Sequence, residues 1–107
     1  MEFAILIVKL SNEMKKKRID FDVVDQIRRS GTSVGANVRE AKASSTKREL
    51  ARFYDIALRS ANETDFWHEV IKQGYGYESA LFDKVKVELN QIEKVIAKIS
   101  VNLKSNL

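Results

Sequence analysis

The sequence contains no cysteine and no proline, and only four of its 107 residues are glycine. Without cysteine the chain can form neither a disulfide framework nor a thiolate metal site, which fits the reducing cytoplasm. Without proline, no residue is barred from a helix interior. Two glycines fall in Gly74-Tyr75-Gly76 and the other two inside an amphipathic stretch. The chain is therefore predicted to be almost entirely helical.

Long apolar runs are also missing. The run from Phe3 to Val8 is far shorter than the roughly 20 residues that cross a bilayer, and it lacks the basic flank and small-residue cleavage site of a signal peptide. We expect no membrane partner. A hydrophobic content of 44% with no sustained composition shift predicts a single domain, residues 1–107, and the lack of cysteine favours the cytoplasm for it.

The single histidine, His68, limits the chemistry that can be expected. A ferritin-like di-metal bundle needs two Glu-x-x-His motifs, whereas Asp65 stands three residues before His68. A helical-bundle ribonuclease with an arginine shortly before its histidine does not fit either, because residues 61 to 63 are Ala, Asn and Glu. No nucleophile and base can be paired from the sequence. We therefore expect a non-enzymatic protein with no metal and no cofactor.

The most informative stretch, residues 26–43, is a helical stripe with two glycines in it. Apolar and small residues recur there at alternating steps of three and four, on one helical face: Val24, Ile27, Gly31, Val34, Val38 and Ala41. An interior glycine costs a helix about 0.8–1 kcal/mol relative to alanine. Gly31 and Gly35 therefore indicate that a neighbouring helix lies close to their backbone.

Two other interpretations of the glycine pair are weaker. A phosphate-binding loop would need a preceding strand and a Lys-Ser or Lys-Thr after the last glycine, but Ala36-Asn37 follows Gly35. A membrane dimerisation face needs an apolar span of roughly 20 residues, and Arg28, Arg29 and Arg39 interrupt this one. A tight helix crossing in a soluble bundle remains. The polar residues of this stretch then bond to the preceding turn or across the crossing: Ser30, Ser33 and Asn37.

The first two helices are predicted from the N-terminal residues. The first runs from about Glu2 to Lys17 and ends in the basic cluster Lys15 to Arg18, which suits a helix C-terminus and could equally bind nucleic acid. Asp20 or Asp22 is predicted to cap the second helix, which contains the glycine pair.

The third helix begins at a capping box formed by Thr46 and Glu49 and runs to about Gln73. Its predicted inward face consists of Leu50, Phe53, Ala57, Ser60, Thr64, Trp67 and Ile71. The middle of this face is small. Ala57, Ser60 and Ala61 are therefore expected to pack against the second helix at Gly31 and Gly35.

The fourth helix, capped by Ser79, carries a heptad stripe of Val85, Leu89, Ile92, Ile96, Ile99 and Leu103. Val87, Val95 and Val101 lie off this stripe. They either widen the core stripe or contact another subunit. Four helices with short connections predict an all-α, antiparallel up-down-up-down four-helix bundle.

Positive charge is modest overall, at +4, but it is concentrated in one region. Between Arg39 and Arg59 there are six basic and three acidic residues. Lys47 and Arg48 stand in the first turn of a predicted helix, where the macrodipole disfavours cations, so contact with phosphate or an acidic partner is one reason for them. The alternative is a solvated face in which Glu49 pairs with its neighbours. The predicted nucleic-acid-binding residues are Arg28, Arg29, Arg39, Lys42, Lys47, Arg48 and Arg52.

Three features stand together within residues 23–75: Arg28-Arg29, a Ser-Val-Gly-Ala-Asn-Val-Arg-Glu core at Ser33 to Glu40, and Arg48-Glu49-Leu50. This segment resembles the bacterial four-helix-bundle family encoded within 23S rRNA intervening sequences. The resemblance implies a homopentameric ring of bundles. It also implies kinship with the accessory variability determinant of diversity-generating retroelements, a basic pentamer that binds nucleic acid and a reverse transcriptase.

The function expected from these observations is binding of RNA or DNA by an oligomeric bundle, through the basic surface at the junction of the second and third helices. The alternative is a structural or protein-interaction module, for example one that binds a reverse transcriptase, without nucleic-acid affinity of its own.

Overall fold

A computed structural model of the chain describes residues 2–105, which form four α-helices and no strand. The helices are α1 (Glu2–Lys16), α2 (Phe21–Lys42), α3 (Lys47–Tyr75) and α4 (Ala80–Ser105). They make an elongated body 46 Å long and 20 Å across in each of the other two directions. The predicted all-α fold of four helices is confirmed.

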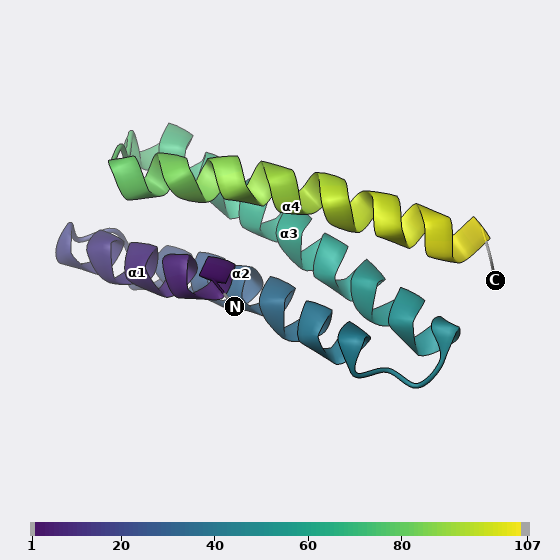
Figure 1. The fold of residues 1–107 in the computed structure, drawn as a ribbon. Coiled ribbons are helices and arrows are strands. Elements are labelled where there is room, and N and C mark those ends of the chain that lie inside the picture. Colours follow the sequence, from purple (N-terminus) through teal and green to yellow (C-terminus); the bar gives the residue numbers. More distant parts are fainter. Residues whose placement is uncertain (1, 106–107) are drawn as a thin grey trace.

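The helices lie side by side, each against two neighbours (Figure 1). α1 and α3 both pack against α2 and α4, while the diagonal pairs are separated within residues 2–105. The α1–α2 and α3–α4 connections lie at one end of the bundle, and the α2–α3 connection lies at the other, near the end of α4 (Figure 1). α1 is the shortest helix and begins beside the middle of α2 (Figure 1).

The start of α3 confirms the predicted capping box with one difference. Thr46 Oγ1 accepts a hydrogen bond from the backbone N–H of Glu49 at 3.1 Å. The Glu49 carboxylate accepts from the backbone N–H of Ser45 at 3.3 Å, one residue before the position that a capping box uses. Both side chains thus hold the start of α3, and the Glu49 carboxylate is bound to the backbone of the connection.

The other helix ends agree with the sequence in part. Ser79 Oγ caps α4 by accepting from the backbone N–H of Phe82 at 3.0 Å, as predicted. Asp20 occupies the N-cap position of α2 but makes no side-chain cap hydrogen bond; its carboxylate instead accepts from the Tyr75 hydroxyl at 2.7 Å. α3 continues past the predicted end at Gln73, and Gly76, with φ of 63°, supplies the left-handed residue that ends it.

The core contains apolar side chains from all four helices. The largest of those that are fully buried are Phe82, Ile7, Leu10, Met14, Ile27, Ile71, Leu89, Val24 and Val85. Within residues 2–105, no helix has the combined length and hydropathy that crossing a membrane requires.

The inward face predicted for α3 is partly wrong. Ala57, Thr64 and Ile71 are fully buried as predicted, whereas Leu50, Phe53, Ser60 and Trp67 are only half-buried. The predicted face omitted buried residues one position away from it, namely Ala51, Tyr54 and His68, and Ala61 is buried as expected for the helix crossing. The reason is that α3 packs against α2 and α4 at once, so it buries a wider face than one stripe describes.

The partner predicted for the glycine pair is also wrong, because both glycines face α1 rather than α3. A Cβ added to Gly31 would lie 2.7 Å from the nearest atom of Ile7 and 2.8 Å from two others. A Cβ added to Gly35 would have one neighbour within 4 Å, the Cβ of Ala4 at 3.8 Å. The close crossing therefore exists at Gly31, where a bulky side chain of α1 fills the space, and Gly35 is in ordinary contact.

The small residues of α3 meet α2 through polar contacts instead. The Ser60 and Ser33 hydroxyl oxygens lie 2.9 Å apart, and Thr64 Oγ1 donates to Ser30 Oγ at 3.0 Å. Asn37 donates to the carbonyl oxygen of Ser33 at 2.9 Å. Both predicted alternatives therefore occur: Ser30 and Ser33 make the polar contact with α3, and Asn37 bonds to the preceding turn of α2. Ala57 and Ala61 are fully buried.

The valines that lie off the α4 stripe are exposed. Val87, Val95 and Val101 expose 56%, 58% and 63% of their surface. The prediction that they widen the core stripe is therefore wrong. No residue among 2–105 covers these three side chains, and contact with another subunit stays a prediction.

Candidate nucleic-acid interface

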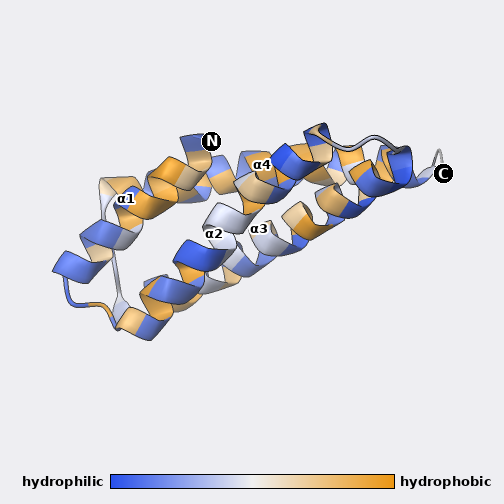
Figure 2. Cartoon of the chain, turned by 90° about the horizontal axis from the view of Figure 1, so that it is seen from below, coloured by the Kyte–Doolittle hydropathy of each residue, from blue (hydrophilic) through white to orange (hydrophobic). Residues whose placement is uncertain are grey.

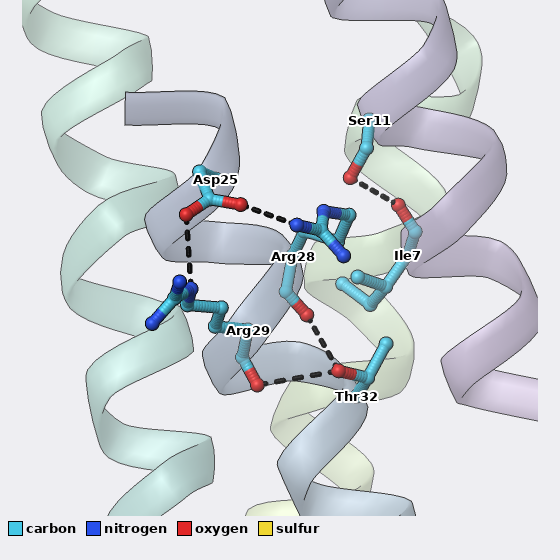
Figure 3. Close-up of polar contacts among 6 residues, drawn as sticks. All are labelled: Ile7, Ser11, Asp25, Arg28, Arg29 and Thr32. Carbon is cyan, nitrogen blue, oxygen red and sulfur yellow. Dashed lines mark hydrogen bonds and ion pairs between the residues drawn. The ribbon is translucent and has the colours of Figure 1, made fainter. Parts of the chain in front are cut away.

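Six of the seven predicted nucleic-acid-binding residues fall into three separate groups, and Lys47 lies outside them. The first group is Arg28 and Arg29, in the first half of α2, where both side chains pair with Asp25 (Figure 3). Arg29 Nε lies 2.9 Å from the carboxylate of Asp25. The hydrogen bond from Arg28, together with the charge of Arg29, holds the pKa of Asp25 below its usual value although desolvation opposes the shift. These two arginines are therefore partly neutralised by their own helix.

The second group is Arg39 and Lys42, at the end of α2. Both are exposed, and no ion pair within residues 2–105 includes either of them. They line the side of α2 that also carries Gly35 and Val38. About 17 Å of helix separates Arg28 from Arg39, at 1.5 Å per residue.

The third group is Arg48 and Arg52, in the first two turns of α3. Both line a shallow cleft of about 460 Å³ between α3 and α4. The cleft brings in two further cations, Arg59 from α3 and Lys104 from the last turn of α4. We call Arg48, Arg52, Arg59 and Lys104 the basic cleft.

One carboxylate, Asp55, lies among the residues of the basic cleft. It pairs with Lys104 at 3.2 Å and accepts a hydrogen bond from Ser100. That hydrogen bond, opposed by desolvation and aided by Lys104, lowers the pKa of Asp55, so this group is ionised at neutral pH. Four cations against one carboxylate leave the basic cleft positive.

The sequence also allowed a solvated face in which Glu49 pairs with neighbouring cations. Among the described residues the structure shows no such pairing. No ion pair within residues 2–105 includes Glu49, whose carboxylate accepts from the backbone of Ser45. Lys47 is exposed at the first residue of α3, next to the basic cleft but outside its lining. Arg52 lies over the ring of Phe53, 5.2 Å from its centroid, so aromatic surface adjoins the cations.

Neither Arg59 nor Lys104 was among the predicted nucleic-acid-binding residues, and Lys104 also lies outside the predicted basic region. A signal for it was available, because adjacent helices joined by a short turn place the last turn of α4 beside the first turns of α3. The other basic cluster, Lys15 to Arg18, lies at the opposite end of the bundle, beside the α3–α4 connection (Figure 1). Lys15 and Lys17 lie over aromatic rings there, 5.7 Å from the centroid of Phe21 and 5.5 Å from that of Tyr77.

The histidine lies in the core. His68 is 2% exposed, and its ring stacks on that of Phe82 with centroids 3.6 Å apart. Nε2 lies 2.9 Å from the carbonyl oxygen of Phe82, so this nitrogen carries the proton and donates it. Burial lowers the pKa of His68, and Nδ1 has no hydrogen-bond partner. The ring therefore packs as a neutral core group.

Comparison with known proteins places these residues in a family. The chain matches the family model described as 23S rRNA-intervening sequence protein over residues 1–98. It is also similar to a crystal structure of a protein with unknown function from the S23 ribosomal protein family of Bacteroides thetaiotaomicron VPI-5482. The two chains are 32% identical, the alignment covers 92% of each, and the TM-score is 0.85. No curated protein matches the chain. The chain belongs to the 23S rRNA-intervening sequence protein family.

Proposed function

We propose that the protein is a non-enzymatic, oligomeric bundle of the cytoplasm that binds RNA or DNA through phosphate contacts in the basic cleft. The single observation that supports this function best is the convergence of Arg48, Arg52, Arg59 and Lys104 on one cleft. Guanidinium groups suit phosphate because their planar forks donate two parallel hydrogen bonds.

The spacing of the arginines fits an extended anion. Arg48, Arg52 and Arg59 span about 17 Å along α3, at 1.5 Å per residue, and Lys104 adds a cation from α4. A row of this length reaches more than one phosphate of a nucleic-acid strand. Contacts of this kind give affinity without base recognition, so binding should be strongly salt-dependent and weakly sequence-dependent.

The position of the cations at a helix start supports the same function. The macrodipole makes the first turn of α3 unfavourable for Lys47 and Arg48, and the nearest carboxylate, Glu49, is bound to the connection. Their presence there does not stabilise the helix. An anionic ligand would compensate for this cost.

Assembly is part of the proposal. We propose that antiparallel up-down-up-down bundles associate into a homopentameric ring, in which the exposed valines of α4 contact a neighbouring subunit. The ring would repeat the basic cleft around its circumference. Several weak phosphate contacts then combine through effective concentration, which offsets the modest net charge of +4.

The second candidate function is a structural or protein-interaction module, for example one that binds a reverse transcriptase, without intrinsic nucleic-acid affinity. The exposed valines of α4 favour it, because apolar surface suits protein partners. A filter-binding titration across salt concentrations separates the two functions. A steep fall of log affinity with log salt supports phosphate contact, and no binding to RNA or DNA at low salt leaves the interaction module.

A further inference from the structure

Half of the bundle has only three helices. α1 has 15 residues, whereas α2, α3 and α4 have 22, 29 and 26. α1 begins beside the middle of α2, so among residues 2–105 the half of the bundle beyond its start contains α2, α3 and α4 alone (Figure 1). Seen from below, apolar residues of α4 are visible beyond the start of α1 (Figure 2).

An apolar groove occupies the place that a longer α1 would fill. It has a volume of about 490 Å³ and is closed at one end by Phe3 of α1. Its walls are Val34 and Val38 of α2, Tyr54 of α3, and Ile92, Ile96 and Ile99 of α4. We call this the open groove.

The α4 wall of the open groove continues the stripe that forms the core elsewhere. Val85 and Leu89, on the part of the stripe alongside α1, are fully buried. Ile92 and Ile99 have the same heptad spacing but are only half-buried, while Ile96 between them is buried. The spacing is that of a surface that packs against a helix, and at Ile92 and Ile99 part of this surface is left uncovered by residues 2–105.

The charge at the groove favours an acidic occupant. Lys42 lines the open groove, and Arg39 lines the adjoining surface of α2. Neither surface has a carboxylate in its lining, and neither cation belongs to an ion pair within residues 2–105.

We propose that the open groove binds an acidic amphipathic helix of a partner protein, which completes the fourth helix of this half of the bundle. The lining from Val34 to Lys42 and from Ile92 to Ile99 has room for about two to three helical turns. Apolar side chains at positions i, i+3 or i+4, and i+7 of the partner would enter the groove, and Asp or Glu beside them would meet Arg39 and Lys42. The α4 helix of a second copy suits the site less well, because it would bring Lys94 and Lys98 towards cations of the same sign.

The test uses two synthetic peptides of fourteen residues each (on the order of four turns), both with leucine at the heptad a and d positions. One carries glutamate at the flanking positions and the other carries lysine there. Binding of each labelled peptide to the full chain is measured by fluorescence anisotropy. The expected result is saturable binding of the glutamate peptide and binding of the lysine peptide that is at least about tenfold weaker.

Charge reversal supplies the matched variants. The double variant Arg39→Glu/Lys42→Glu should lose at least about tenfold in affinity for the glutamate peptide and gain affinity for the lysine peptide. The control Lys15→Glu/Lys16→Glu makes the same charge change at the other end of the bundle and should leave both affinities unchanged. Circular dichroism of both variants should show unchanged helix content, since all four side chains are exposed.

Three outcomes would overturn the inference. The first is no saturable binding of the glutamate peptide, and the second is equal loss in the control variant. The third concerns Val95, which lines the groove and is 58% exposed. Suppose that Val95→Lys dissociates an oligomer and that the wild-type oligomer binds neither peptide. The groove is then occupied by a second copy of the chain and not by a partner protein. Failure of these measurements leaves nucleic-acid binding by the basic cleft untouched, because that cleft lies between α3 and α4.

Discussion

Ile7 of α1 fills the space that a side chain at position 31 of α2 would need. The three nearest atoms to a Cβ built on Gly31 all belong to Ile7, at 2.7 to 2.8 Å, which is closer than non-bonded carbon atoms approach. Figure 3 shows the Ile7 side chain directed at α2. Because Ile7 is fully buried, it has no free space to move into.

The first prediction follows from this contact. Gly31→Ala should destabilise the protein, because overpacking a core costs about 1–3 kcal/mol and outweighs the gain in helix propensity of about 1 kcal/mol. Gly35→Ala should be neutral or stabilising by up to about 1 kcal/mol, since Ala4 is its one neighbour within 4 Å. Urea unfolding of the two variants measures the difference.

A double-mutant cycle with Ile7→Ala identifies the contact as the cause. The double variant Ile7→Ala/Gly31→Ala should be more stable than the sum of the two single changes predicts, by about 1 kcal/mol. Additive effects would show that Gly31 is required for a reason other than Ile7.

The second prediction concerns acid sensitivity. Burial lowers the pKa of His68 below 6.5, so between that pKa and 6.5 the unfolded chain binds more protons than the folded one. The stability contributed by neutral His68 is complete above pH 6.5 and is lost as the pH falls towards the folded pKa. Urea unfolding at intervals from pH 7.5 downwards should show this loss.

The control for that loss is His68→Gln, which keeps a donor for the carbonyl oxygen of Phe82 but does not titrate. It should have a flatter stability profile in the same pH window. Asp65, Glu69 and Lys86 also act on the histidine, and all three remain in the variant. An equal slope in both proteins would assign the acid sensitivity to other groups.

The third prediction concerns the contact between α1 and the α3–α4 connection. The Glu13 carboxylate accepts hydrogen bonds from Tyr77 and, at 2.6 Å, from Ser79. Desolvation and the bond to Glu13 raise the pKa of Tyr77 to about 12. Stability from this bond is therefore present below pH 10, the usual value, and is lost as the pH rises from 10 to 12.

Glu13→Ala should lower the unfolding free energy by about 1–3 kcal/mol, because it leaves two part-buried donors without their acceptor. A spectrophotometric titration of tyrosine should show one group that ionises near pH 12 in the wild type and at a lower pH in the variant, where desolvation alone still holds the pKa above its usual value. If the titration curves coincide, Tyr77 does not owe its raised pKa to Glu13.

The fourth prediction concerns assembly. Replacing Val87, Val95 and Val101 together by lysine should abolish self-association, since their exposed surface is the proposed contact between subunits. Sedimentation velocity should then show a monomer of 12.3 kDa for the variant and a larger species for the wild type. A monomeric wild type at micromolar concentration would contradict the proposed ring.

The helices and their caps could be predicted because they depend on local sequence. The Thr46 and Glu49 capping box and the Ser79 cap act within one turn, and both are present in the structure. The partner of Gly31 could not be predicted in the same way. Periodicity places a residue on a helical face, but which of two neighbours covers that face depends on how α2 sits between α1 and α3.

The candidate site could likewise be predicted only as far as local sequence decides it. Basic residues near each other in sequence were grouped, yet Arg28 and Arg39 lie on different parts of α2, and Arg28 is paired with Asp25. Lys104 joins the cleft from α4 although it is distant in the sequence. The tertiary arrangement therefore decides which cations act together.

The central claim is that the basic cleft binds nucleic-acid phosphates, and the salt dependence of binding in a cleft variant tests it most directly. Arg48→Gln/Arg52→Gln/Arg59→Gln should weaken binding to any RNA or DNA sequence about equally and flatten the slope of log affinity against log salt by about two to three. The control Lys15→Gln/Lys16→Gln/Lys17→Gln, at the opposite end of the bundle, should keep the wild-type slope. A normal slope in the cleft variant together with loss of binding in the control would contradict the account.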